Sequence, residues 1–321
     1  AIMAGNTAFD EILSTTLKNY ETQLADNVFT ARPLFYALSN QQTMRTVGGG
    51  AKIVVPVLYG KNSTAGSYSG LDPIDVTAQT GISAAEYDWG QFAATVTING
   101  LQEAQNNSTE QIIDLLESKI FQTQESIIEA MNVMFFADGT GNGGKDWNGL
   151  TNIIDHSTAA GNALGGIDPA AAGTANDWWT SQHHAQGGAL TLAKMGEIYN
   201  KCSVGNDQPT IIITTRVLYE KYEALLQPQL RYTDTKMADA TFQNLVYRAV
   251  PVTYDDDCTA GRMYFLNTKY LQLVRHADTW FQSTPFVRPH TLDAVFSQIL
   301  CYGQLTCSNR ARQGYITGAT A

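Results

Sequence analysis

The stretch that decides the fold is STEQIIDLLESKIFQTQESIIEAMNVMFFA, residues 108–137. It opens with Ser108-Thr109-Glu110-Gln111, which has the S-x-x-Q spacing of a capping box, where two side chains satisfy free backbone N–H groups at a helix start. Apolar residues then recur three, four and seven positions apart, which places them on one helical face. These residues are Ile112, Leu116, Ile120, Ile127, Met131 and Met134. The pattern predicts one helix of about 29 residues, roughly 43 Å long, which ends before Asp138-Gly139 and forms a spine.

Upstream of this helix, two predicted strands flank a long polar segment. Gly48-Gly49-Gly50 precedes a run rich in Val and Ile at Lys52–Tyr59, which predicts one strand, and Trp89–Asn99 predicts another. The residues between them, Gly60–Asp88, are rich in Gly, Ser, Thr, Asp and Ala. Structureless loops longer than about 15 residues are uncommon in compact domains. We therefore expect a projecting arm that something outside the domain receives.

The N-terminal segment, residues 1 to about 47, predicts an extended arm with a short helix. Phe9–Leu24 has mixed helical periodicity, and Ala31-Arg32-Pro33 interrupts it before the apolar run Leu34–Leu38. Proline removes a backbone donor and ends or breaks a helix. With no core of its own nearby, this segment is expected to extend away from the rest of the chain.

Downstream of the long helix, residues 139–188 predict loops, because they are rich in Gly, Asn and Ala. From Thr191 onward, helical and strand patterns alternate, which predicts a separate α/β unit. Its predicted helices and strands are Thr191–Cys202, Thr210–Thr214, Arg216–Leu226, Leu245–Tyr254, Met263–Leu266 and Tyr270–Val274. The last stretch, Ala294–Thr317, predicts strands that pair back near the long helix.

Composition excludes several classes of protein. Of 321 residues, 16% are charged and 44% are hydrophobic, and the net charge is −10. The apolar share is too high for a disordered chain. The acidic balance argues against affinity for nucleic acid or anionic membranes. Two interpretations of the low charge stay open: a surface that mostly meets other copies of the chain, or the polar but uncharged surface of an enzyme.

Membrane and secretory signals are not expected in this sequence. No run approaches the roughly 18 apolar residues of a membrane span, and the N-terminus lacks the basic and apolar regions of a signal peptide. None of the four cysteines forms a C-x-x-C pair. We expect buried free thiols in a reducing compartment. The four are Cys202, Cys258, Cys301 and Cys307.

Two motifs could suggest a ligand site, but neither has the context it needs. Gly139–Lys145 fits both G-x-G-x-x-G and G-x-x-x-x-G-K. Both motifs need a strand before and a helix after, so that helix N–H groups hold phosphates. Here the glycines follow a helix, which predicts a flexible exit loop. His183 and His184 are expected in a loop, without metal-ligand spacing.

The acidic and basic clusters also favour structural interpretations. Asp255-Asp256-Asp257 lacks the spacing of an EF-hand; it predicts a solvated turn, with a weak cation contact as the alternative. Arg310 and Arg312 are expected at the surface or as ion-pair donors between subunits. The sequence therefore predicts no catalytic residue, no cofactor and no metal site.

The order of elements resembles a known family. The matching features are GGGAKIVVPVLY at residues 48–59, YDWGQ at 87–91, Asn106 before the long helix, FFADGT at 135–140, and Asn148-Gly149-Leu150. Over nearly its whole length, the chain resembles the major capsid proteins of tailed double-stranded DNA bacteriophages. The resemblance implies an α+β fold, the HK97-like major capsid fold, with an extended E-loop β-hairpin and an α/β axial domain.

The resemblance also implies a division of the chain. The parts are an N-arm (1–47), an E-loop (48–106), a peripheral domain with the spine helix (107–190), an axial domain (191–290) and return strands of the peripheral domain (291–321). Such proteins form hexamers and pentamers that close into an icosahedral shell around double-stranded DNA, which the wall encloses without specific binding. Implied further partners are scaffolding, portal and decoration or cement proteins. The implied location is the virion capsid, assembled in the host bacterial cytoplasm, with no membrane partner.

Candidate contacts between subunits lie on segments without a core of their own. They are Phe9, Tyr59, Lys61, Tyr68 and Trp89. Some relatives crosslink through a Lys on the E-loop, and Lys61 lies at a suitable tip, but no receiving Asn or catalytic Glu is identifiable, so we predict no crosslink. The rival hypothesis is a soluble α/β enzyme or ligand-binding protein with its site in residues 191–290.

Overall fold

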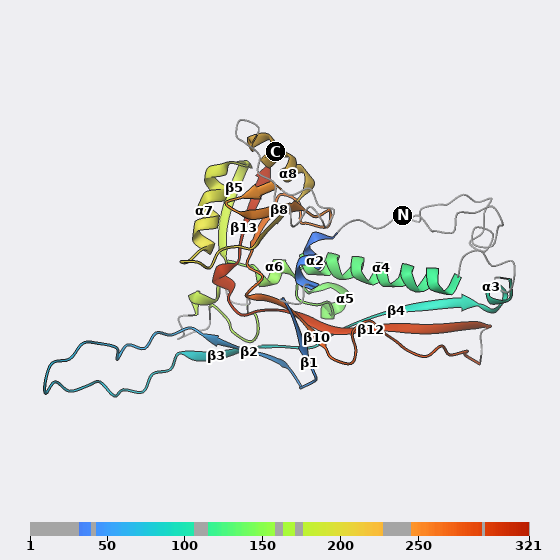
Figure 1. Cartoon of the computed structure of the whole chain (residues 1–321), viewed down its shortest axis with the longest axis horizontal. Helices are drawn as coiled ribbons and strands as arrows, with labels where there is room; N and C mark the ends of the chain where they lie inside the picture. Colours follow the sequence, from blue (N-terminus) through green and yellow to red (C-terminus); the bar gives the residue numbers. More distant parts are fainter. Residues whose placement is uncertain are drawn as a thin grey trace.

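Two β-sheets and a separate two-stranded hairpin organise the chain (Figure 1). The computed structural model describes residues 32–39, 43–105, 115–157, 163–170, 176–226, 245–290 and 293–320. Phe9, the rest of the segment before residue 32, and the predicted capping box at 108–111 lie outside these ranges. Within them, no helix is both long enough and apolar enough to cross a membrane.

The first sheet is long and narrow, and its longest pairing joins residues far apart in sequence. Its strands are β1 (Met44–Val47), β10 (Leu271–His276), β12 (Ala294–Cys307), β11 (Gln282–Ser283) and β4 (Gly90–Asn99). Strands β4 and β12 run antiparallel from Asn99↔Ala294 to Gly90↔Gly303. The predicted strand at 89–99 is therefore confirmed, and so is the return of the stretch after residue 294 toward the helix.

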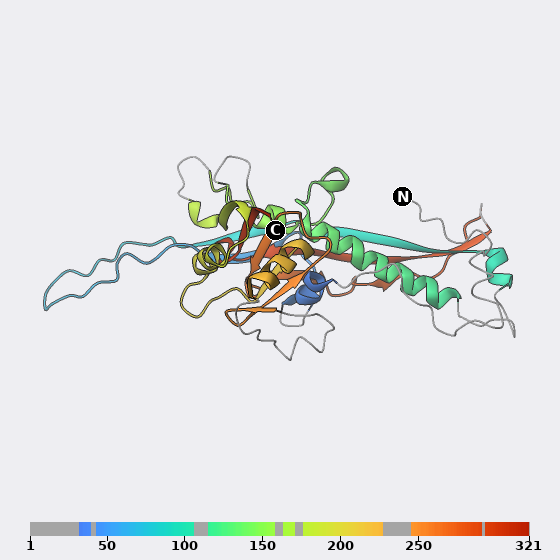
Figure 2. The ribbon, with the colours of Figure 1, turned by 90° about the horizontal axis from the view of Figure 1, so that it is seen from above.

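Helix α4 (Leu115–Phe136) packs along this sheet on the side of β4 (Figures 1 and 2). It ends where the sequence predicts, and Ile127, Met131 and Met134 of its apolar stripe are buried. Helix α2 (Pro33–Ser39), the predicted short helix, packs against α4 and β10 through buried Leu34 and Leu38. The helical spine is therefore built from the predicted face.

The second sheet has six strands in the order β5-β13-β9-β6-β8-β7 and carries the predicted α/β unit. Its strands are β5 (Gln182–Ala189), β13 (Gly314–Thr320), β9 (Met263–Leu266), β6 (Ile211–Thr214), β8 (Val250–Tyr254) and β7 (Leu245–Tyr247). Helices α7 (Leu192–Cys202) and α8 (Arg216–Leu226) pack against it. Both helices are confirmed, as are β6 and β9.

Side chains alternate between two cores across this sheet. In β6, Ile212 faces the core shared with α7 and α8, whereas Ile211 and Ile213 face the main core under α4. Tyr264 of β9 packs against Phe136 of α4 in the main core, with ring centroids 6.0 Å apart. Because both faces of these strands are buried, they read as continuous apolar runs in the sequence. The two sheets thus form one packed body.

Four strand predictions need correction. Residues 182–189, predicted as loop, form edge strand β5. This segment carries no strand signal, because it contains two glycines and lacks β-branched residues. Residues 245–254 form a hairpin, because Arg248 and Ala249 adopt φ of 47° and 66° and make a two-residue turn without the usual Asn-Gly. Strand β10 belongs to the first sheet, and β13 pairs with β5 and β9 in the second. Hydrophobic patterning does not specify partners.

The projecting arm is confirmed, but its pairing differs from the prediction. Strand β2 (Ile53–Leu58) pairs with β3 (Ile82–Tyr87), in register from Ile53↔Tyr87 to Leu58↔Ile82. The sequence predicts a loop over residues 60–88, so β3 was not predicted. Its two alanines and one glutamate have low strand propensity. The polar tip therefore spans 59–81.

The remaining short elements connect these layers. They are α3 (Gly100–Gln105), α5 (Gly141–Gly144), α6 (Leu150–Ile153), η2 (Asp177–Trp179) and η3 (Arg310–Arg312). The glycine motif at 139–145 follows α4 and contains only the single turn α5, as a helix-exit loop requires. All four cysteines are buried and free, as predicted.

Candidate assembly interface

The β2–β3 hairpin extends well beyond the body (Figures 1 and 2), and it carries exposed apolar side chains. Residues 61–80 are exposed apart from Thr64, which is half-buried. Leu71 and Val76 are almost wholly exposed, and Tyr68 and Ile74 are about two-thirds exposed. Large apolar side chains that are exposed together on one segment indicate a candidate interaction site. The tip is therefore the strongest candidate for a contact with another protein.

The paired part of the hairpin has two different faces. In β2, buried and exposed side chains alternate strictly, as the two-residue period of a strand requires. The buried face holds Ile53, Val55 and Val57, and the exposed face holds Val54, Pro56 and Leu58. Because the outward face is also apolar, the hairpin packs one apolar surface against its own chain and leaves a second one exposed.

Tyr59 and Trp89 contact their own chain at opposite ends of the paired part of the hairpin, Tyr59 at the outer end and Trp89 at the base. The Tyr59 ring stacks on Trp178, with centroids 5.2 Å apart and planes 13° apart. The Trp89 Nε1–H group donates to the Gly50 carbonyl at 2.8 Å, and its ring meets His276 edge-on at 5.6 Å. Both residues therefore have an intramolecular role that the sequence prediction missed.

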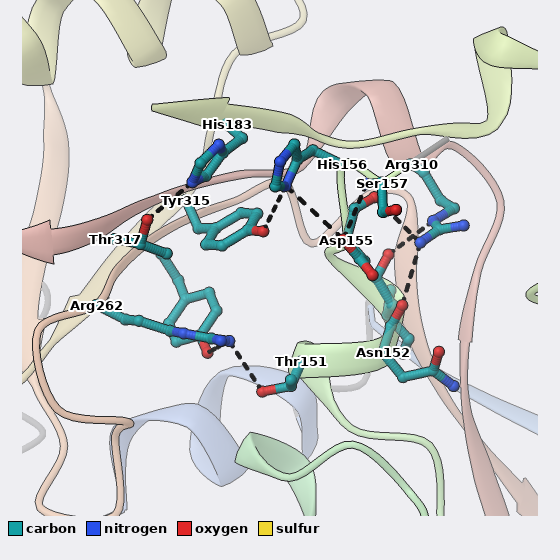
Figure 3. A network of polar contacts seen from close by, with 12 residues as sticks. Thr151, Asn152, Asp155, His156, Ser157, His183, Arg262, Arg310, Tyr315 and Thr317 are labelled. Atoms are coloured by element: carbon teal, nitrogen blue, oxygen red, sulfur yellow. Dashed lines mark hydrogen bonds and ion pairs between the residues drawn. The ribbon is translucent and has the colours of Figure 1, made fainter. Parts of the chain in front are cut away.

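A polar network joins the loop after α6 to the second sheet (Figure 3). His156 Nδ1 lies 2.8 Å from Tyr315 Oη, and His183 Nε2 lies 2.8 Å from Thr317 Oγ1. The two imidazole rings stack at 3.8 Å. Arg262 Nη1 donates to Thr151 Oγ1 at 3.1 Å. The network therefore attaches α6 and its following loop to β5, β9 and β13.

The paired histidines lie on a strand, not in the predicted loop. Successive side chains of a strand point to opposite faces, so His183 faces the network, while His184 Nδ1 lies 3.2 Å from a Glu197 carboxylate oxygen on α7. Burial, followed by the neighbouring His156, lowers the pKa of His183 to about 4. Across the described ranges, no three His, Cys, Asp or Glu side chains are grouped to hold a metal ion.

The acidic turn after β8 is a joint between three elements. Asp255 is 2% exposed, so the predicted solvated turn is wrong for this residue. Its carboxylate accepts from the buried Asn132 Nδ2 of α4 at 3.0 Å and from the Leu34 N–H of α2 at 3.4 Å. Asn132 Nδ2 also donates to Asp257 Oδ2 at 2.7 Å. Only Asp256 faces solvent, where it pairs with Arg216 at 3.1 Å. The joint ties β8 to both helices.

Replacing Asp255 with Asn should remove a pH dependence of stability. Burial raises the pKa of Asp255 from 3.8 to about 6. Between about pH 4 and pH 6 the folded chain therefore holds this proton more tightly than the unfolded chain. The stabilisation of the folded chain by this proton is fully present below pH 4 and is lost as the pH rises through 6. Urea denaturation from pH 4 to 8 should show Asp255→Asn gaining stability relative to the wild type across this window.

Asp256→Asn is the matched control, because it removes the neighbouring but exposed carboxylate. The free energy of unfolding of Asp256→Asn, relative to the wild type, should not rise between pH 4 and pH 6 as that of Asp255→Asn does. A constant difference between Asp255→Asn and the wild type from pH 4 to 8 would show that the buried carboxyl does not titrate in this window.

Comparison with known proteins identifies the fold. No protein-family model and no curated protein matches the sequence. Among solved structures, a chain of the cyanophage A-1(L) capsid asymmetric unit aligns with a TM-score of 0.71 at 16% identity, over 99% of this chain and 100% of that one. This chain has the fold of a phage capsid protein. A chain of the native GTA particle capsid also aligns, with a TM-score of 0.61 at 12% identity, over 99% and 100%.

The same fold also occurs in a protein whose name does not refer to a phage. A chain of the holo-SrpI encapsulin complex from Synechococcus elongatus PCC 7942 aligns with a TM-score of 0.57 at 11% identity, over 92% of this chain and 93% of that one. At these identities the likeness concerns the fold. In all three cases it covers both sheets, so it does not depend on one shared motif.

On this capsid-protein fold, the predicted contact residues fall into separate places. Lys61 and Tyr68 are exposed on the hairpin tip, Tyr59 lies at the outer end of the paired strands, Trp89 lies at the base, and Phe9 is outside the described ranges. Sequence reasoning missed Leu71 and Val76, although both are apolar residues within a polar segment, which was the available signal. It also missed Trp178, for which the sequence offered no signal beyond a Trp pair.

Proposed function

We propose that this chain is the structural subunit of an icosahedral phage capsid, which self-assembles into hexamers and pentamers around double-stranded DNA. The observation that carries the proposal is the hairpin: it bears exposed apolar side chains that its own chain does not cover, on a chain that aligns end to end with capsid proteins. Copies related by symmetry reuse the same surfaces. The role is structural and not enzymatic.

The proposed division of labour follows the HK97-like plan. Residues 1–47 act as an N-arm, 48–106 as the E-loop, 107–190 with 291–321 as the peripheral domain, and 191–290 as the axial domain that gathers at capsomer centres. One refinement comes from strand pairing, because β13 hydrogen-bonds with β9 and β5 and so ties the C-terminus to the axial sheet. In this scheme the hairpin lies across an adjacent subunit.

The charge balance suits such a container. With a net charge of −10, a wall of these subunits does not bind phosphate strongly, because phosphate binding requires clustered Lys and Arg. DNA is thus enclosed without specific binding. Scaffolding, portal and decoration or cement proteins complete the proposed set of partners, and the site of assembly is the host bacterial cytoplasm.

Electron microscopy with size-exclusion chromatography tests this function directly. Purified chain should elute as capsomers or megadalton particles, and micrographs should contain closed shells. A stable monomer whose melting temperature rises on adding a small molecule would instead support a soluble enzyme or binding protein with its site in 191–290. The comparisons give that rival no support, because the aligned structures include chains of two capsids.

A further inference from the structure

The base of the hairpin combines a flexible entry with a rigid platform. Gly49 and Gly50 enter β2 with φ of 142° and 121°, and a Cβ on Gly48 or Gly49 would meet no atom within 4 Å. This part of the backbone therefore adopts conformations open only to glycine and is not confined by packing. The glycine run alone does not set the direction in which the hairpin leaves the body.

Contacts on the body side hold the inner half of the hairpin. The Glu86 N–H group donates to the Gly165 carbonyl at 2.8 Å. Tyr87 Oη donates to the Cys307 carbonyl at 2.8 Å and accepts from the Cys307 N–H at 3.2 Å. These contacts fix β3 near its C-terminal end, next to β12. Farther out, buried Val55 and Val57 pack β2 against the body, so the part of the hairpin that still needs a restraint begins beyond Leu58.

The restraint farther along the hairpin is an aromatic stack. Tyr59 directly follows β2, and its ring lies on Trp178 with centroids 5.2 Å apart. Trp178 packs against Trp179 at 5.4 Å, and Trp179 is itself buried and donates through Nε1 to the Leu164 carbonyl at 3.0 Å. The partner of Tyr59 is thus anchored in the body. Stacked aromatic pairs stabilise a contact beyond the apolar area that they bury.

A small rotation at this stack becomes a large movement at the tip. Leu71 lies thirteen positions after Leu58, a length of roughly 40 Å when the chain is extended. A rotation of about 10° at the stack then moves the tip by roughly 7 Å over that length. Such a shift is enough to misalign the exposed Leu71 side chain with a binding surface on another subunit.

We infer that Tyr59 and Trp178 are positioning residues: their stack sets the angle of the hairpin and thereby the angle between neighbouring subunits. The inference rests on the proposed shell function and adds a role that the predicted inter-subunit contact at Tyr59 did not include. It requires the ring of Tyr59 but not its hydroxyl, because the contact is made face to face. Tyr59→Phe therefore separates this role from a hydrogen bond to a partner.

The first test measures the hairpin angle in the unassembled full-length chain. Spin labels at Ser67→Cys on the tip and Glu220→Cys on α8 report the distance distribution, and the four native cysteines are buried and so are not labelled. Tyr59→Ala, and separately Trp178→Leu, should at least double the width of this distribution. Tyr59→Phe should reproduce the wild-type width. An unchanged width in both disruptive variants would overturn the inference.

The second test measures particle diameter by electron microscopy. Tyr59→Ala should give open or variable shells, whereas Tyr59→Phe should give uniform shells like those of the wild type. Uniform shells of wild-type diameter from Tyr59→Ala would overturn the link between hairpin angle and subunit angle. If the wild type itself formed no shells, the proposed function would fail, while the distance measurement would still decide whether the stack holds the hairpin.

Discussion

Shell assembly should be lost when Leu71 and Val76 in the hairpin tip are both replaced by aspartate. Both side chains are almost wholly exposed in the isolated subunit. Burying each one against a neighbour contributes about 1.5–3 kcal/mol, and the double variant replaces that gain with the cost of burying two carboxylates. A loss of about 4 kcal/mol per contact corresponds to a roughly 1000-fold weaker association. Light scattering over a concentration series measures the onset of assembly.

The isolated subunit should not be affected by the same double substitution. Substitutions of exposed side chains away from special features change stability by about 0.5 kcal/mol or less, so the urea midpoint before assembly should stay at the wild-type value. Ser67→Asp is the matched control, since it adds charge to the same exposed tip without removing an apolar group. Its assembly onset should shift less than tenfold. Assembly of Leu71→Asp/Val76→Asp at the wild-type concentration would exclude the tip as a contact.

Local elements of this fold could be predicted where one side chain pattern dominates. The end of α4 at Phe136 follows from its apolar stripe and the Asp138-Gly139 exit. Strands β6 and β9 follow from short apolar runs, because they are buried on both faces. These signals arise from residues near one another in sequence, so no knowledge of the rest of the fold was needed.

Pairing partners could not be predicted from the same signals. Strand β4 pairs with β12, almost two hundred residues away, and the hairpin pairs β2 with the weakly patterned β3. Register depends on which apolar faces meet in three dimensions. For the same reason the burial of Asp255 was missed: three consecutive aspartates look solvated until Asn132 and Leu34 are brought to the first of them.

The candidate interface was predicted as a segment better than as residues. A long polar insertion between strands indicates a projecting arm, and the structure has one. The predicted residues Lys61 and Tyr68 are exposed on it. Tyr59 and Trp89 contact their own chain, and the exposed Leu71 and Val76 were not predicted. An aromatic ring beside the paired strands of an arm finds a partner in the body more easily than an aliphatic side chain at its tip.

Replacing Arg310 with Met should unfold or severely destabilise the subunit. Arg310 was expected at the surface or between subunits, but its side chain is fully buried. Its guanidinium donates through Nε to the Ile153 carbonyl at 2.8 Å and through Nη2 to the carbonyls of Asn152 and Asp155, both at 3.1 Å. The last carbonyls of a helix lack partners within it, so Arg310 caps the C-terminal end of α6. A cation there is also favoured by the helix dipole.

The loss should be large because Met fills the space without donating. Each buried carbonyl left without its donor costs about 1–3 kcal/mol, so three such groups cost on the order of 3–9 kcal/mol, a large part of the 5–15 kcal/mol typical of a folded domain. The free energy of unfolding of Arg310→Lys should lie between those of the wild type and Arg310→Met, because one ammonium group cannot reproduce the planar guanidinium fork. Urea denaturation of the unassembled subunit measures the free energy of unfolding.

Arg312→Met provides the matched control on the same turn. Arg312 is the third residue of η3 and is half-buried, so its replacement should cost less than about 1 kcal/mol. The comparison separates loss of a charge on this turn from loss of the cap on α6. Equal effects at positions 310 and 312 would contradict the capping role. Because η3 connects β12 of the first sheet to β13 of the second, a large effect confined to Arg310 would mean that this one side chain stabilises the junction between the sheets.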